Sequence, residues 1–234
     1  MLKKAMAEAT GTFALVLIGT GAIVLGDGTA GLLGVALAFG FIVIAMAYSV
    51  GTVSGAHMNP AVSLAMYLNK RLSFNGLLTY VAAQLIGAIA GSAMLRLFLS
   101  QSGRDMANMG ATVLAEGVTN TGGFIIELVL TFLFVLVILT ATGQKGDPHL
   151  AGLIIGLTLI ALILVGGTTT GASLNPARSL GPAIFTGGAA LSQMWLYTLA
   201  PLLGGTLASF VAKYVLDTEM GASGVEQEKD QRIA

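Results

Sequence analysis

Two Asn-Pro-Ala triplets stand out in this chain because their residue types and their repetition suggest one shared chemical task. The first is Asn59-Pro60-Ala61, and the second, 116 positions later, is Asn175-Pro176-Ala177. Asn is a favoured helix N-cap and Pro is favoured at the first helical position, so each triplet predicts the start of a helix. A side-chain amide placed there offers N–H groups beside the positive end of a helix dipole. Such a pair would orient a passing oxygen atom and repel cations.

The residues around the triplets also match. Ser54-Gly55-Ala56-His57-Met58 precedes the first triplet and Thr170-Gly171-Ala172-Ser173-Leu174 precedes the second. These small residues suit a backbone that approaches a narrow channel closely. Arg178 follows one turn into the second helix, where a fixed cation at membrane depth would bind polar solutes and exclude cations. The alternatives are ordinary N-caps in buried loops and an Arg that extends to the membrane surface.

Two carboxylates occupy equivalent places in the two halves of the chain. Glu8 lies four residues before Thr12-Phe13, and Glu127 lies four residues before Thr131-Phe132. A proton relay is one interpretation. We favour a supporting role, in which each carboxylate accepts hydrogen bonds from buried N–H groups of the irregular loops.

The elements that must position these residues are membrane helices. The chain is 55% hydrophobic and 9% charged, against about 25% charged in soluble domains. Its formal net charge is zero, which gives no indication of nucleic-acid binding. It has no cysteine, which excludes thiol chemistry. A span needs about 20 apolar residues, and six runs qualify: 5–25, 31–51, 76–98, 122–142, 149–167 and 193–216.

The apolar pieces 59–68 and 175–186 are too short to span. Short segments of this kind at matching places in two halves indicate a site at the membrane midplane. Each half holds three spans, so the second half is inverted relative to the first. The sequence thus predicts an all-α membrane domain over 1–216, with repeats of about 1–98 and 122–216, and a charged, disordered tail over 217–234. Basic residues gather on the side of both termini, which predicts cytoplasmic termini.

The duplicated triplets and the inverted repeat resemble the aquaporin and glycerol-facilitator family, the major intrinsic proteins, over nearly the whole chain. The resemblance implies six transmembrane helices, two re-entrant half-helices and passive flow of water and small uncharged solutes, without a cofactor or metal. It also implies a homotetramer in the plasma membrane, surrounded by lipid. The backbone carbonyls that it places along the pore belong to Gly55, Ala56, His57, Met58, Gly171, Ala172 and Ser173.

The same resemblance places the narrowest point at Phe39, Ile163, Ala172 and Arg178. Water-selective members usually carry His at the position of Ile163, and glycerol-selective members carry Gly there. The Ile and its small partner look more like the archaeal aquaporins. Ser179 replaces the Asp that follows this Arg in glycerol facilitators, which favours the aquaporin branch. Glycerol selectivity and gas permeability remain open as alternatives to a water channel.

Two other classes of protein compete with a channel. A secondary transporter can also have inverted repeats and broken helices, but it needs a buried ion-coupling cluster, and Glu8 and Glu127 are the only acids in the spans. A membrane enzyme needs an acid–base or metal set, and the chain has no nucleotide-binding loop, metal-ligand cluster or nucleophile triad. Passive transport is therefore the favoured interpretation.

Overall fold

A computed structural model of the chain describes residues 1–26 and 31–216. Within these ranges all regular secondary structure is helical, as the sequence predicts. The sequence also predicts a turn at Asp27-Gly28 between the first two spans; these two residues and the tail predicted from Asp217 lie outside the described residues.

Six long helices match the six predicted spans in order: α1 (Leu2–Val24), α2 (Gly31–Tyr48), α5 (Phe74–Gln101), α6 (Asn120–Ala141), α7 (Ala151–Gly166) and α10 (Met194–Tyr214). Five of them are long and apolar enough to cross a membrane, judged by length and composition. The sixth, α7, has 16 residues, or about 24 Å of helix. A hydrogen-bonded turn continues beyond it, in which Thr170 N donates to Gly166 O.

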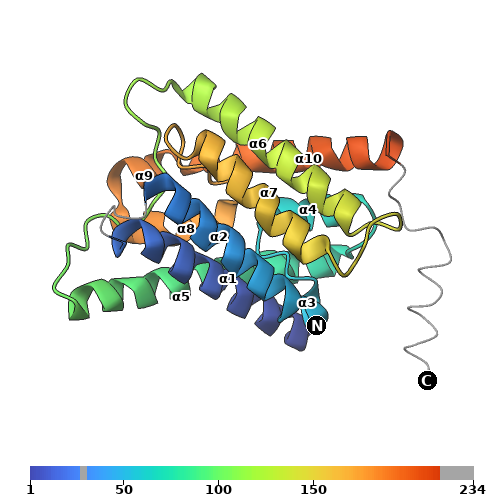
Figure 1. Cartoon of the computed structure of the whole chain (residues 1–234), viewed down its shortest axis with the longest axis horizontal. Helices are drawn as coiled ribbons and strands as arrows, with labels where there is room; N and C mark the ends of the chain where they lie inside the picture. The colour runs from blue at the N-terminus through green and yellow to red at the C-terminus, as the bar shows by residue number, and fades with distance from the viewer. Residues whose placement is uncertain (27–30, 217–234) are drawn as a thin grey trace.

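The two short helices predicted after the triplets are α4 (Pro60–Leu68) and α8 (Pro176–Thr186). Both lie inside the bundle of long helices (Figure 1), and two further short helices, α3 (Gly51–Ser54) and α9 (Gly188–Ser192), lead into α4 and out of α8. Figure 1 also shows the beginning of α1 and the end of α10 at the same end of the bundle. This is the arrangement that an even number of spans requires.

Small residues bring the long helices into close contact in the same way in both halves. In the first half α1 packs on α5, and in the second half α6 packs on α10. A Cβ atom added to Gly87 would lie 2.3 Å from Ala9 O, and one added to Gly204 would lie 2.4 Å from Leu128 O. Close backbone approach through small residues is typical of helix packing in membranes.

The contact between α2 and α7 joins the two halves through a matched pair of glycines. A Cβ atom on Gly156 would lie 2.6 Å from Gly40 O, and a Cβ atom on Gly40 would lie 2.7 Å from Gly156 O. Each glycine therefore makes room for the backbone of the other. The inverted repeat is thus visible in the packing as well as in the sequence.

Candidate pore and its constriction

The two half-helices begin at the predicted asparagines. Asn59 has an extended backbone, and its Oδ1 accepts a hydrogen bond from Ala61 N at 2.9 Å. Asn175 Oδ1 accepts from Ala177 N at 3.0 Å and from Arg178 N at 3.2 Å. Proline occupies the first helical position in both cases. Its lack of an N–H costs nothing there, because the N–H of this position has no acceptor within the helix.

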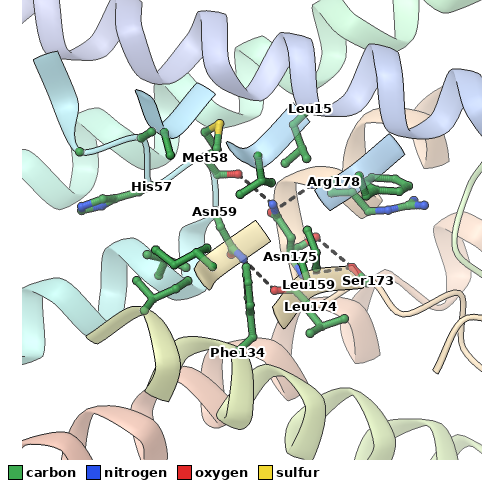
Figure 2. A pocket seen from close by; sticks show the side chains of 18 of the residues that line it. Leu15, His57, Met58, Asn59, Phe134, Leu159, Ser173, Leu174, Asn175 and Arg178 are labelled. Atoms are coloured by element: carbon green, nitrogen blue, oxygen red, sulfur yellow. Dashed lines mark hydrogen bonds between the residues drawn. The ribbon is translucent and has the colours of Figure 1, made fainter. Parts of the chain in front are cut away.

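The remaining atoms of the two amides join the half-helices to each other (Figure 2). Asn59 Nδ2 donates to Leu174 O at 2.8 Å, and Asn175 Nδ2 donates to Met58 O at 2.8 Å. Each amide nitrogen carries two N–H groups, so one hydrogen of each remains for a molecule in the cavity that both asparagines line. The positive ends of two helix dipoles meet at this point.

The loops ahead of the asparagines take the same unusual backbone course. Three matched pairs have positive φ: Gly55 at 87° and Gly171 at 78°, Ala56 at 47° and Ala172 at 42°, Met58 at 50° and Leu174 at 52°. A residue with a Cβ in this region is disfavoured by about 1–2 kcal/mol. The loops hold this conformation because other groups fix it, and the cavity is lined along them by Gly55, Ala56, His57, Met58, Ala172 and Ser173.

Glu8 is one of the groups that fix the first loop. Its carboxylate is fully buried and accepts four hydrogen bonds, at 2.7–2.8 Å. Two of the donors are the backbone N–H groups of His57 and Met58, and the others are Ser54 Oγ and Gln84 Nε2. Every oxygen lone pair of the carboxylate thus has a donor.

Glu127 has the equivalent place in the second half, with one partner fewer. Ser173 N and Leu174 N donate to it at 2.8 Å, and Thr170 Oγ1 donates at 2.7 Å. A tyrosine also braces each loop: Tyr80 donates to Ser54 O and Tyr197 donates to Thr170 O, both at 2.7 Å. The tyrosines lie 117 positions apart, and this repeat spacing is the sequence signal that relates them.

The four residues that the resemblance places at the constriction lie where two cavities meet. The cavity that holds the two asparagines, called the inner cavity, encloses about 70 Å³. The second, called the outer cavity, is bordered by the loop between α5 and α6 and encloses about 330 Å³. Phe39, Ile163 and Arg178 line both cavities. Ala172 lines the inner cavity and its neighbour Gly171 the outer one. All four side chains are at least 96% buried, so the passage between the cavities is narrow.

The Arg178 side chain is held from two directions. Its Cζ lies 4.9 Å from the centroid of the Phe39 ring, and its Nη1 donates to Gly110 O at 3.0 Å. Gly110 belongs to the long loop between α5 and α6, and no motif in that loop predicts a partner for Arg178. Arg178 and His57 lie toward opposite ends of the inner cavity, with the asparagines between them (Figure 2).

The other walls of the inner cavity are apolar and were not singled out from the sequence. They include Leu15, Val43, Val62, Phe134, Ile138 and Leu159. These residues occur within apolar runs, where nothing in the sequence separates a cavity-facing side chain from a lipid-facing one. The cavity therefore combines the hydrogen-bonding groups of the two loops with apolar side chains from α1, α2, α4, α6 and α7.

The family model described as Major intrinsic protein matches residues 1–212. The chain belongs to the major intrinsic protein family. Glycerol uptake facilitator protein-like 6 of Lactiplantibacillus plantarum is 45% identical over 213 residues, which cover 91% of this chain and 97% of that protein. Aquaporin Z of Rhodopseudomonas palustris is 42% identical over 219 residues, with 89% and 91% covered.

A solved structure shares the major intrinsic protein fold. The aquaglyceroporin from Plasmodium falciparum superposes with a TM-score of 0.83 at 24% identity, and the match covers 92% of this chain and 96% of that one. The predicted fold of six spans and two half-helices is thereby confirmed. Among the described residues, 1–26 and 31–216, no group of three or more His, Cys, Asp or Glu side chains is arranged to hold a metal ion.

Proposed function

We propose that this major intrinsic protein is a passive, non-enzymatic membrane channel for water and small uncharged solutes that excludes protons and other ions. The observation that carries the proposal is the pair of cavities joined at Phe39, Ile163 and Arg178. A solute that passes between them moves from the Arg178 guanidinium to the amides of Asn59 and Asn175. All three groups donate hydrogen bonds, and Arg178 adds a fixed positive charge.

The exclusion of protons rests on the fixed donors at the centre of the pore. A water molecule that accepts a hydrogen bond from each asparagine has both oxygen lone pairs engaged and cannot pass a proton along the file. The helix dipoles of α4 and α8 add positive potential at the same place. In this proposal the carbonyls of residues 55–58 and 171–173 accept the hydrogens of water on either side.

The composition of the constriction favours solutes with carbon as well as water. Phe39, Ile163 and Ala172 give apolar contact, while Arg178 gives hydrogen-bond donors to hydroxyl groups. A glycerol molecule can place its CH groups on the first set and its hydroxyls on the second. The two relatives, named a glycerol uptake facilitator-like protein and an aquaporin, are compatible with both solutes.

Stopped-flow light scattering on proteoliposomes tests this proposal. Vesicles that contain the protein should shrink in osmotic shock much faster than empty vesicles, and should then re-swell when glycerol is the osmolyte. If the water flux equals that of empty vesicles, the channel function is wrong. A flux that saturates and depends on an ion gradient would instead favour a secondary transporter.

We further infer that residues 1–216 form one channel unit and that it assembles as a homotetramer, with both termini in the cytoplasm of a plasma membrane. Large apolar side chains face outward on α2 and α7, among them Phe41 and Leu157, and suit contact with lipid or with neighbouring protomers. Native mass spectrometry in detergent should give four times the mass of one chain. Because the chain has no cysteine, a single Lys3→Cys variant should react with an impermeant thiol reagent only from the cytoplasmic side.

A further inference from the structure

A chain of three hydroxyl groups connects the long outer loop to the centre of the pore. Thr112 Oγ1 lies 2.6 Å from Ser179 Oγ, and Ser179 Oγ lies 2.6 Å from Ser173 Oγ. Ser173 Oγ then donates to the backbone oxygen of Asn175 at 3.0 Å. All three hydroxyl-bearing residues are at least 96% buried, with Ser179 fully buried between Thr112, which lines the outer cavity, and Ser173, which lines the inner one.

The direction of the hydrogen bonds along this chain follows from proton counting. A hydroxyl group has one hydrogen to donate, and Ser173 gives its hydrogen to Asn175 O. Ser179 must then be the donor to Ser173, which leaves its own oxygen as the acceptor for Thr112. Thr112 is therefore the donor at the start of the chain, and a residue without a hydroxyl cannot take its place.

In the first half of the molecule, the equivalent serine receives its hydrogen bond from a residue of a long helix. The counterpart of Ser179 is Ser63, 116 positions earlier, and Ser63 Oγ accepts a hydrogen bond from Gln84 Nε2 at 2.9 Å. Tyr80 in α5 corresponds to Tyr197 in α10, so the counterpart of Gln84 is Pro201. Proline has no polar side-chain group. In the second half, the donor comes instead from the loop.

The same stretch of loop holds the neighbouring side chain of α8. Gly110 O accepts a hydrogen bond from Arg178 Nη1, and Thr112, two residues further along the loop, is hydrogen-bonded to Ser179. Gly110 has φ of +67°, and a Cβ atom there would lie 2.9 Å from Thr20 Cβ in α1. This stretch of the loop thus packs against α1 at Gly110 and forms hydrogen bonds with two consecutive residues of the half-helix, Arg178 and Ser179.

We propose that Thr112 is a positioning residue that sets the width of the outer constriction. Its hydrogen bond keeps the Ser179 hydroxyl turned toward Ser173, and Ser173 in turn fixes the turn between Ala172 and Asn175. Without the Thr112 donor, Ser179 is free to bond back to its own helix. Ser173 then loses a partner, and the wall formed by Ala172 gains freedom to move away from Arg178.

This inference rests on the proposed channel function, and the decisive quantity is the ratio of glycerol to water permeability. Thr112→Val has nearly the same shape as Thr but no hydroxyl. We expect its permeability ratio to rise about three-fold, which corresponds to about 0.7 kcal/mol, because a wider gap helps the larger solute more. Thr112→Ser restores the donor and should restore the wild-type ratio.

The matched control is Thr206→Val, since Thr206 donates only to Leu202 O within α10 and does not line either cavity. This variant should leave the ratio unchanged. If wild-type vesicles are no faster than empty ones, the channel function is wrong and the inference falls with it. If the wild type conducts but Thr112→Val keeps the wild-type ratio, or if Thr112→Ser does not restore it, the inference alone is overturned.

Discussion

Removing the Glu127 carboxylate tests whether the second loop depends on it. In a Glu127→Ala variant the backbone N–H groups of Ser173 and Leu174 lose their acceptor. The Thr170 hydroxyl loses its bond to Glu127 as well, but it also lies 3.4 Å from Gly166 O and can keep that partner. Two buried backbone donors are therefore left without an acceptor.

The expected loss of stability follows from these two donors. Each buried donor without a partner costs about 1–3 kcal/mol, so the variant should lose about 2–6 kcal/mol of unfolding free energy. For a chain of this size, 1 kcal/mol lowers Tm by about 2–4 °C. We therefore expect Tm to fall by at least about 4 °C. Glu8→Ala should lose more, because four donors, two of them backbone N–H groups, point at that carboxylate.

Thermal unfolding in detergent, followed by tryptophan fluorescence, measures this effect. Trp195 is the single tryptophan, and its ring lies 6.2 Å from that of Phe124 in α6, so its signal reports on packing in the second half. Glu116→Ala is the matched control, since this carboxylate is exposed in the long loop between α5 and α6. The expected order of Tm is Glu8→Ala lowest, then Glu127→Ala, then the control, which should equal the wild type.

One result would refute the reasoning. If Glu8→Ala and Glu127→Ala melt with the control and yet lose water flux, the carboxylates act in transport and do not support the loops. Loss of flux together with loss of stability agrees with the supporting role. Measuring Tm and flux on the same preparations separates the two interpretations.

Two further predictions concern selectivity. Ile163→His adds a polar group to the constriction and narrows the gap beside Ala172, so glycerol flux should fall about ten-fold or more while water flux falls much less; equal loss of both fluxes would count against a wide, apolar constriction. Proteoliposomes should also hold a pH gradient during rapid water flow, because Asn59, Asn175 and Arg178 interrupt the proton path; a proton leak that grows with protein content would contradict this.

Much of the fold could be predicted from the sequence because its signals are local and strong. Apolar runs of sufficient length set the spans, and Asn59-Pro60 carries both an N-cap and a first-turn proline. The duplication then placed α4 and α8 opposite each other. The helix ends were predicted less well: the run predicted to extend to 51 stops being helical at Tyr48, and α5 continues from the predicted 98 to Gln101.

The site was predictable where it repeats and much less so elsewhere. The resemblance brought Phe39, Ile163, Ala172 and Arg178 together, and in the structure they meet between the two cavities. The hydrogen bond between Gly110 O and Arg178 could not be predicted, because a contact to a backbone carbonyl 68 positions away does not depend on residue type. The apolar residues that line the cavity could not be predicted either, because side chains that face the cavity and side chains that face lipid are of the same types.

The reciprocal bonds between Asn59 and Leu174 and between Asn175 and Met58 have a consequence for biosynthesis. The partner of the Asn59 amide is made 115 residues later, which at about 5–20 residues per second is a delay of about 6–23 seconds. If the first half inserts into the bilayer as it is made, the Asn59 amide has no hydrogen-bond acceptor from the second half during that time. The nascent chain must therefore keep α4 near water, or shielded by the insertion machinery, until α8 is synthesised and the two halves close on each other.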